Sequence, residues 1–412
     1  GLTMSNTERI PNGYRITEAG ILPVEWRAKR LNEVATELTE RAGQDMYETV
    51  SISAGIGFVN QAEKFGKELS GKQYEKYIVL HKGDFSYNKG NSKTSPQGCI
   101  YRLNDRESAA VPNVFESFRI KEQDADYYEQ LFLSGFLNRQ LYSRINRGVR
   151  DDGLLNLTGK DFYSCMVPVP PIDEQKQIAK ILAQCDKIIE LKQRLIAEEE
   201  KKKRWLIENL LADGVETEFH KCCTNTGEYG LNAPSCPFNP SLPRYIRITD
   251  IDDRGRYQRE NPVSVDIQDV ENYLLEEGDI LFVRTGGTVG KAYRYIPQDG
   301  ELVYAGFLIK FSVNQKLYDA RFIYYQFLTQ RYRNWVATMS ARSGQPGINA
   351  TEYGKYLIKI PGSIQKQSKI ADILSASDIL IDRLTQELNQ WNLKKAALSR
   401  LLLNGSVRVK AQ

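Results

Sequence analysis

Two segments of the chain carry apolar residues at steps of four and three, a pattern typical of long helices that pack along a seam. One begins at Pro170 with PPIDEQKQIAKILAQCDKIIELKQRL, and the other begins at Pro361 with PGSIQKQSKIADILSASDILIDRLTQEL. Gly214 and Gly405 follow the two patterns, as expected where a helix ends. The pattern therefore predicts two long helices.

The second segment repeats the first at an offset of 192 residues, so that Ile178 corresponds to Ile370 and Asp186 to Asp378. An apolar stripe is stable only when another surface covers it, so we expect the two helices to pair as an antiparallel coiled coil. The predicted seam consists of Ile178, Leu182, Ile189 and Leu206 in the first helix and Ile370, Leu374, Ile381, Leu384, Leu388 and Leu398 in the second. The run EEEKKKR at Glu198–Arg204 predicts a solvated face with ion pairs four residues apart.

The stretches before the two helices contain short alternating runs rich in Tyr and Gly, which favour strands. They also resemble each other: VLHKGDFSYNKGNSK in the first matches LLEEGDILFVRTGGTVGK in the second, and each stretch ends in an aromatic helical segment and a Gly/Arg loop. We predict an α+β protein with two α/β domains separated by the two antiparallel coiled-coil helices, as a pseudo-two-fold internal repeat. The expected boundaries are 1–168 and 215–360 for the domains and 169–214 and 361–412 for the helices.

Composition narrows the class of protein only slightly. The 412 residues carry a formal net charge of +4, which allows a nucleic-acid partner without requiring one. No apolar run approaches membrane-spanning length, and the start of the chain has no signal-peptide pattern. The six cysteines have no framework spacing, so we expect reduced thiols and a cytoplasmic location.

Stretches that suggest an enzyme or a metal site have ordinary structural explanations in this sequence. TGGTVGKA lacks the first glycine and the final Ser or Thr of a phosphate-binding loop. His220 lies near Cys222, Cys223 and Cys236, but adjacent cysteines do not reproduce the paired C-x-x-C spacing of zinc sites, so ordinary thiols are favoured. The three aspartates of DIDDRG fit a turn between strands better than a metal site. We expect a non-catalytic chain with no metal and no cofactor of its own.

Glycine-rich loops in both halves carry residues suited to DNA. Glycine lets the backbone approach phosphates, Lys and Arg neutralise them, and Asn, Gln and Arg form paired hydrogen bonds with base edges. Each such residue alone is also consistent with an ordinary surface position, whereas their parallel placement in the two halves favours DNA binding. The candidate DNA-binding residues are Asn88, Lys89, Lys93, Arg147, Arg150, Arg284, Lys291, Arg342 and Gln345.

Six motifs follow one another in a fixed order along nearly the whole chain: EAGILPVEW, PPIDEQKQIAKIL, YGLNAPS, YIRITDID, RTGGTVGK and LLLNGSVRV. With them the chain resembles the specificity subunit of a type I restriction–modification system. The resemblance implies two target recognition domains, each recognising one half of a split, asymmetric sequence in double-stranded DNA. It also implies that the helices dock two methyltransferase (modification) subunits, that a restriction/translocase subunit joins them, and that S-adenosylmethionine binds to the methyltransferase partner.

Two other functions stay open from the sequence. A self-contained methyltransferase or nuclease would bind S-adenosylmethionine as the isolated chain. A non-DNA-binding structural adaptor would meet only protein, and its affinity for DNA would be absent or independent of salt.

Overall fold

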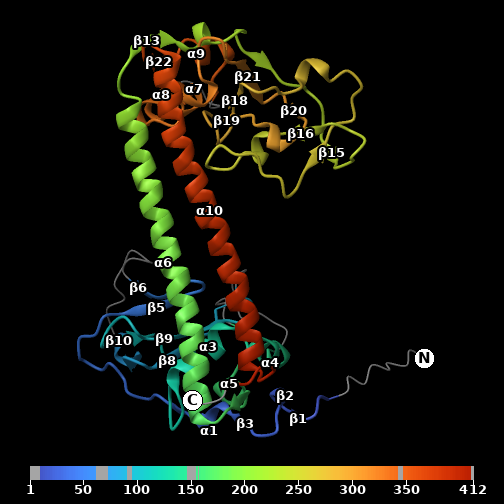
Figure 1. Ribbon diagram of the computed structural model, residues 1–412. Coiled ribbons are helices and arrows are strands. Elements are labelled where there is room, and N and C mark those ends of the chain that lie inside the picture. The colour runs from blue at the N-terminus through green and yellow to red at the C-terminus, as the bar shows by residue number, and fades with distance from the viewer. Residues whose placement is uncertain are drawn as a thin grey trace. The chain divides into compact units, whose positions relative to one another are not determined.

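The computed structural model of the chain describes residues 10–61, 73–90, 95–145, 155, 157–341 and 347–409. The chain divides into two compact units: unit 1 is residues 1–192 with 387–412, and unit 2 is residues 193–386. Both divisions fall inside a long helix, α6 (Ile172–Leu210) or α10 (Ile364–Leu403), whose label is given in Figure 1. Each unit therefore contains part of both long helices.

Unit 1 combines short strands with short helices before α6. Its strands are β1 (Tyr14–Thr17), β2 (Gly20–Pro23), β3 (Arg27–Arg30), β4 (Ala35–Glu37), β5 (Val50–Ser53), β6 (Gly57–Asn60), β7 (Ile78–His81), β8 (Phe85–Asn88), β9 (Cys99–Arg102), β10 (Ser108–Val111), β11 (Glu116–Ile120) and β12 (Met166–Val169). Its short helices are α1 (Leu31–Val34), η1 (Tyr74–Lys76), α3 (Ala125–Leu133), α4 (Asn138–Arg144) and α5 (Gly159–Tyr163).

Unit 2 has the same mixture between α6 and α10. Its strands are β13 (Val215–Glu218), β14 (Glu228–Tyr229), β15 (Cys236–Pro237), β16 (Arg244–Ile246), β17 (Val263–Ser264), β18 (Asp279–Val283), β19 (Ala292–Arg294), β20 (Leu302–Tyr304), β21 (Leu308–Ser312) and β22 (Leu357–Ile360). Its short helices are η2 (Phe219–Cys222), η3 (Ile248–Asp250), η4 (Glu271–Tyr273), η5 (Pro297–Asp299), α7 (Ala320–Gln326), α8 (Gln330–Ser340) and α9 (Ala350–Gly354).

A four-stranded antiparallel sheet lies at the centre of each unit. Its strand order is β4-β11-β8-β9 in unit 1 and β14-β21-β18-β19 in unit 2. In each unit a two-stranded ribbon, β12-β3 or β22-β13, ends where the next residues enter a long helix. The last three strands of the two sheets follow one another in the same order, so the turns after β8 and β18 occupy equivalent positions.

The first turn of each long helix holds a short helix of the domain that precedes it. Asp124 caps the start of α3 and Asp319 caps the start of α7 through side-chain oxygens that accept backbone N–H groups. Gln175 of α6 accepts the backbone N–H of Asp124 at 3.0 Å, and Gln367 of α10 accepts that of Asp319 at the same distance. Both glutamines are buried, so these bonds fix the start of each long helix.

The predicted seam residues all lie on a covered side of their helix. Buried members are Ile178, Leu182, Ile370, Leu374, Ile381 and Leu384, and half-buried members are Ile189, Leu206, Leu388 and Leu398. Lysines occupy three further seam positions and extend to a carboxylate on the facing helix, as long cationic side chains do at an apolar boundary. The pairs are Lys192 with Glu387 (2.6 Å), Lys203 with Asp378, and Lys395 with Asp186. The last two pairs are related by the 192-residue offset.

The prediction of ion pairs four residues apart in EEEKKKR is wrong. Lys202 pairs with Glu199, three residues earlier, at 3.3 Å. Lys203 lies on the seam and reaches Asp378, while Glu200 pairs with Arg254 of the domain. Glu200 and Lys203 therefore join α6 to its surroundings in unit 2, because tertiary partners were available that the helix alone does not reveal.

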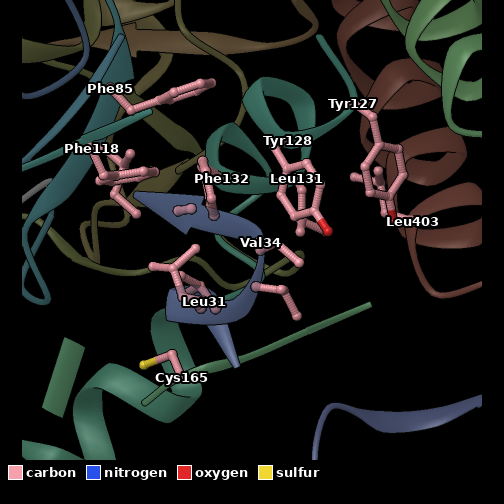
Figure 2. Packing of buried hydrophobic residues seen from close by; sticks show 14 of the residues in the cluster. Leu31, Val34, Phe85, Phe118, Tyr127, Tyr128, Leu131, Phe132, Cys165 and Leu403 are labelled. Carbon is pink, nitrogen blue, oxygen red and sulfur yellow. The ribbon is translucent and has the colours of Figure 1, made fainter. Parts of the chain in front are cut away.

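Each unit has its own aromatic core that includes residues of both long helices. In unit 1 the core contains Phe85, Phe118, Phe132, Ile178 and Leu403, and Figure 2 shows the packing around the aromatic members. Phe118 stacks on Phe85 with ring centroids 5.4 Å apart.

In unit 2, Phe282 lies in β18, the strand equivalent to β8 of unit 1, and is fully buried. Its ring centroid lies 4.7 Å from that of Phe327 and 4.8 Å from that of Tyr353. Ile207, Ile370 and Leu374 bring the two long helices into the same core. The apolar stripes of the helices are thus shared between the seam and the domains.

Because the cores are separate, damage to one is expected to stay local. Phe282→Ala should lower the free energy of unfolding of unit 2 by about 3–5 kcal/mol, through reduced apolar burial and the cavity left behind. Hydrogen exchange followed by mass spectrometry should show faster exchange in β18 and β21 and unchanged exchange in β8 and β11. Phe118→Ala is the matched variant, with the opposite distribution. Equal acceleration in both units of either variant would contradict the assignment of two cores.

Candidate nucleic-acid interface

The described candidate DNA-binding residues lie in the turn after β8 and in the turn after β18. Asn88 ends β8 and Lys89 follows it, while Arg284 follows β18 and Lys291 precedes β19. Equivalent backbone bonds hold the two turns: the N–H of Leu155 donates to the carbonyl of Lys89 at 3.0 Å, and that of Ile348 donates to the carbonyl of Arg284 at 2.8 Å. The sheets thus place Lys89 and Arg284 at corresponding positions.

Asn88 uses its amide inside the domain. Its Nδ2 donates to the carbonyl of Ile52 at 3.0 Å, and its Oδ1 accepts the N–H of Gly90 at 2.8 Å. Gly98, which has a φ of +77°, closes the far side of the turn, where a Cβ would lie 2.4 Å from the carbonyl oxygen of Asn88. Asn88 therefore shapes the turn in this structure.

Lys89 is neutralised within unit 1. Its Nζ lies 2.6 Å from Glu116, and the side chains are only 17% and 13% exposed. The same ammonium donates to the carbonyl of Leu157 at 3.3 Å. A phosphate that met Lys89 would have to displace a carboxylate held at hydrogen-bonding distance.

Arg284 has a different environment. Its guanidinium lies over the ring of Tyr229, 4.8 Å from the centroid, and within the described ranges no carboxylate forms an ion pair with it. The tyrosine is held in turn, since its hydroxyl accepts the N–H of Ala350 at 3.2 Å. Stacking on a ring face leaves the N–H groups at the edge of a guanidinium able to donate to an acceptor.

Lys291 connects two loops of unit 2. Its Nζ lies 3.0 Å from the exposed carboxylate of Asp253 and donates to the carbonyl of Ile251 at 3.2 Å. Only 18% of its side chain is exposed. The bond to Asp253 is at the surface, and Lys291 holds the turn before β19 against the loop at residues 251–253.

Five candidates lie outside the described residues: Lys93, Arg147, Arg150, Arg342 and Gln345. The assignment of DNA contact to all nine candidates stays a prediction.

Three residues near the turns were missed as candidates by sequence reasoning. Tyr229 lies under Arg284, and Gly230 next to it has no room for a side chain, because a Cβ would lie 2.3 Å from the carbonyl oxygen of Ala305. Phe307 is 58% exposed, and its carbonyl accepts the N–H of Arg284 at 3.0 Å. The YGLNAPS motif marked Tyr229 without revealing its partner, because that partner is 55 residues further along the chain.

The Gly-Asp motif of both halves fixes the start of the central strand. Asp84 accepts the N–H of His81 at 2.7 Å, and Asp279 accepts that of Glu276 at 2.9 Å. Asp84 also forms two hydrogen bonds with Arg119, whereas the second partner of Asp279 is the hydroxyl of Ser312. Burial raises the pKa of Asp279, against the opposing effect of its hydrogen bonds.

The other clusters have structural roles. Asp250 pairs with Arg247, and Asp252 accepts the N–H groups of Arg254 and Arg256, as in a turn. Burial raises the pKa of Cys222 to about 11, which opposes the thiolate form that binds metals. In the described part of the chain, no three His, Cys, Asp or Glu residues are grouped as metal ligands. No helix among these residues is both long and apolar enough to cross a membrane.

Two solved structures with similar folds come from work on type I restriction–modification systems. The chain is similar to the specificity subunit of the type I restriction–modification system of M. genitalium, with a TM-score of 0.59, 14% sequence identity, and coverage of 96% of this chain and 98% of that chain. It is also similar to a chain from work on complex assembly and conformational transition of the type I system, with a TM-score of 0.56, 15% identity, and coverage of 94% and 99%. These likenesses concern the fold.

Sequence comparison gives the family. The chain is 25% identical to the type I restriction enzyme MjaVIII specificity subunit of Methanocaldococcus jannaschii, over 63% of this chain and 66% of that protein. It is 23% identical to the putative MjaX specificity subunit of the same organism, over 96% and 97%. The family model of the type I restriction modification DNA specificity domain matches residues 23–201 and 237–391, which is most of the chain. The chain therefore belongs to the family of type I restriction–modification DNA specificity proteins.

Proposed function

We propose that this chain is the DNA-recognition subunit of a type I restriction–modification enzyme, and that it recognises a split, asymmetric sequence in double-stranded DNA. Each unit would recognise one half of the target. The chain itself would be non-catalytic, and the methyl and strand-cleavage chemistry would belong to its partners.

The observation that carries this proposal is the repeated turn beside the central strand. Lys89 and Arg284 follow equivalent strands of sheets with the same order, and both carbonyls accept a backbone N–H from the segment before a short helix. Two copies of one surface with different side chains are suited to two different half-targets, because base edges are distinguished by side chains. A pseudo-two-fold repeat would therefore produce an asymmetric target.

We further propose that α6 and α10 form an antiparallel coiled coil that keeps the two half-targets at a fixed separation. The seam lysines support this, since the 192-residue repeat offset relates the Lys203–Asp378 pair to the Lys395–Asp186 pair. Helix α6 has 39 residues, about 58 Å at about 1.5 Å per residue. That length exceeds one helical turn of DNA, about 34 Å, so unrecognised bases would lie between the half-targets.

The partners follow from the same proposal. Two methyltransferase subunits would dock on the helices, and a restriction/translocase subunit would complete the enzyme in the cytoplasm. S-adenosylmethionine would bind to the methyltransferase partner. Apolar side chains left exposed on the helices, Leu195 and Trp205 on α6 and Leu393 on α10, support a protein partner there. A structural adaptor that never meets DNA is not favoured, because the matched family is one of DNA specificity domains.

Salt dependence tests DNA binding directly. The full chain with its methyltransferase partner should bind a duplex of mixed sequence with an affinity that falls with salt, at a log–log slope of about −0.9 per phosphate neutralised. A duplex that carries the target sequence found by methylated-base mapping should bind more tightly than the mixed-sequence duplex at every salt concentration. Fluorescence anisotropy measures both. An affinity that is absent, or that does not change with salt, would favour the adaptor instead.

A further inference from the structure

Lys89 and Arg284 follow equivalent strands and accept equivalent backbone hydrogen bonds, but their charges have different surroundings. Lys89 in unit 1 lies 2.6 Å from Glu116, and both side chains are mostly covered. Arg284 in unit 2 lies on the ring of Tyr229, with no ion-pair partner within the described ranges. The positive charge of Lys89 is therefore offset, whereas that of Arg284 is retained.

Tyr229 is itself fixed from three sides. Its backbone pairs with Ile309 in the central sheet, its hydroxyl accepts the N–H of Ala350 at the start of α9, and the next residue, Gly230, lies against the carbonyl of Ala305. A rigid ring under a guanidinium limits the orientations of a long, otherwise mobile side chain. It also leaves the guanidinium edge free for an acceptor outside the protein.

On the basis of the proposed function, we propose that Tyr229 is a positioning residue that holds Arg284 for contact with a DNA phosphate, and that Lys89 serves only inside unit 1. The ligand class is the phosphodiester backbone. The second recognition unit then supplies a salt-sensitive contact that the equivalent position of the first does not.

Variants of Arg284 and Lys89 test separately whether each residue contacts DNA. Arg284→Gln removes the retained charge, and the double change Lys89→Gln with Glu116→Gln removes the internal pair while keeping hydrogen-bonding groups. The probe is a duplex carrying the target found by methylated-base mapping, bound by the chain with its methyltransferase partner. Between 50 mM and 200 mM salt, the decrease in affinity should be about 3.5-fold smaller for Arg284→Gln than for wild type, as expected when one phosphate is no longer neutralised. The Lys89/Glu116 variant should keep the wild-type slope.

The tyrosine variants test positioning. Tyr229→Phe keeps the ring and should keep the wild-type salt slope. Tyr229→Leu removes the ring and should reduce the slope toward that of Arg284→Gln, and combining the two changes should reduce the slope no further. Circular dichroism and thermal melting of each variant identify any that do not fold.

Three results would overturn the proposal: a wild-type slope for Arg284→Gln, an equal reduction of slope in the Lys89/Glu116 variant, or a wild-type slope for folded Tyr229→Leu. If Tyr229→Leu does not fold, the contrast between Arg284 and Lys89 still decides whether the retained charge meets DNA. Failure of the proposed function itself looks different, since the wild-type complex would then show no salt-dependent binding of the duplex.

Discussion

Seven residues inserted into each long helix should widen the unrecognised spacer of the DNA target by about three base pairs, with both half-targets unchanged. Seven residues add about 10 Å to a helix at about 1.5 Å per residue. DNA rises about 3.4 Å per base pair, so the added length matches about three pairs. A heptad preserves the seam, because the apolar pattern repeats every seven residues.

The insertion points follow from the ion pairs. One heptad enters after Lys192 and the other before Glu387, so that this pair stays together in unit 1 while Lys203 keeps Asp378 in unit 2. The control inserts the heptad into α6 alone, which shifts the seam on one side and should prevent stable pairing. Methylated-base mapping reports the spacer. A folded double-insertion variant that still methylates the original spacer would show that the helices do not set the separation.

Local patterns in the sequence predicted what depends on neighbours along the chain. The four-and-three pattern placed two helices where the structure has α6 and α10, and residues such as Ile178 and Ile370 are buried on them. Both glycines have positive φ, and Gly405 closely follows Leu403, the last residue of α10, whereas Gly214 lies a full turn beyond Leu210, the last residue of α6. These features need only helix periodicity and backbone sterics.

Side-chain contacts between residues far apart in the chain could not be predicted from the sequence. Lys89 was chosen as a phosphate ligand from its Gly-rich surroundings, and its pairing with Glu116 follows from the packing of the first domain, which one sequence does not specify. The contact between Tyr229 and Arg284 also depends on tertiary packing, because it requires β14 to pair with β21 at the edge of the sheet that contains β18. Side-chain partners across a sheet depend on register, and a shift of one residue would reverse every side chain.

The central claim is that the two units recognise separate half-targets, and a domain exchange should alter only one of them. Residues 215–360 would be replaced by the matching segment of another specificity subunit. These bounds keep β13 and β22 together, since they pair along their whole length. The donor should carry apolar residues at the positions that face Ile207, Ile370 and Leu374, because these helix residues complete the core of unit 2.

Methylated-base mapping of genomic DNA from cells that express the exchanged chain with its methyltransferase partner is the deciding measurement. The same mapping with the unexchanged chain is the reference. The account predicts a target with one half replaced by the donor's half, the other half unchanged, and the original spacer. A target in which both halves change together, or in which neither half changes while methylation continues, would contradict separate recognition by the two units.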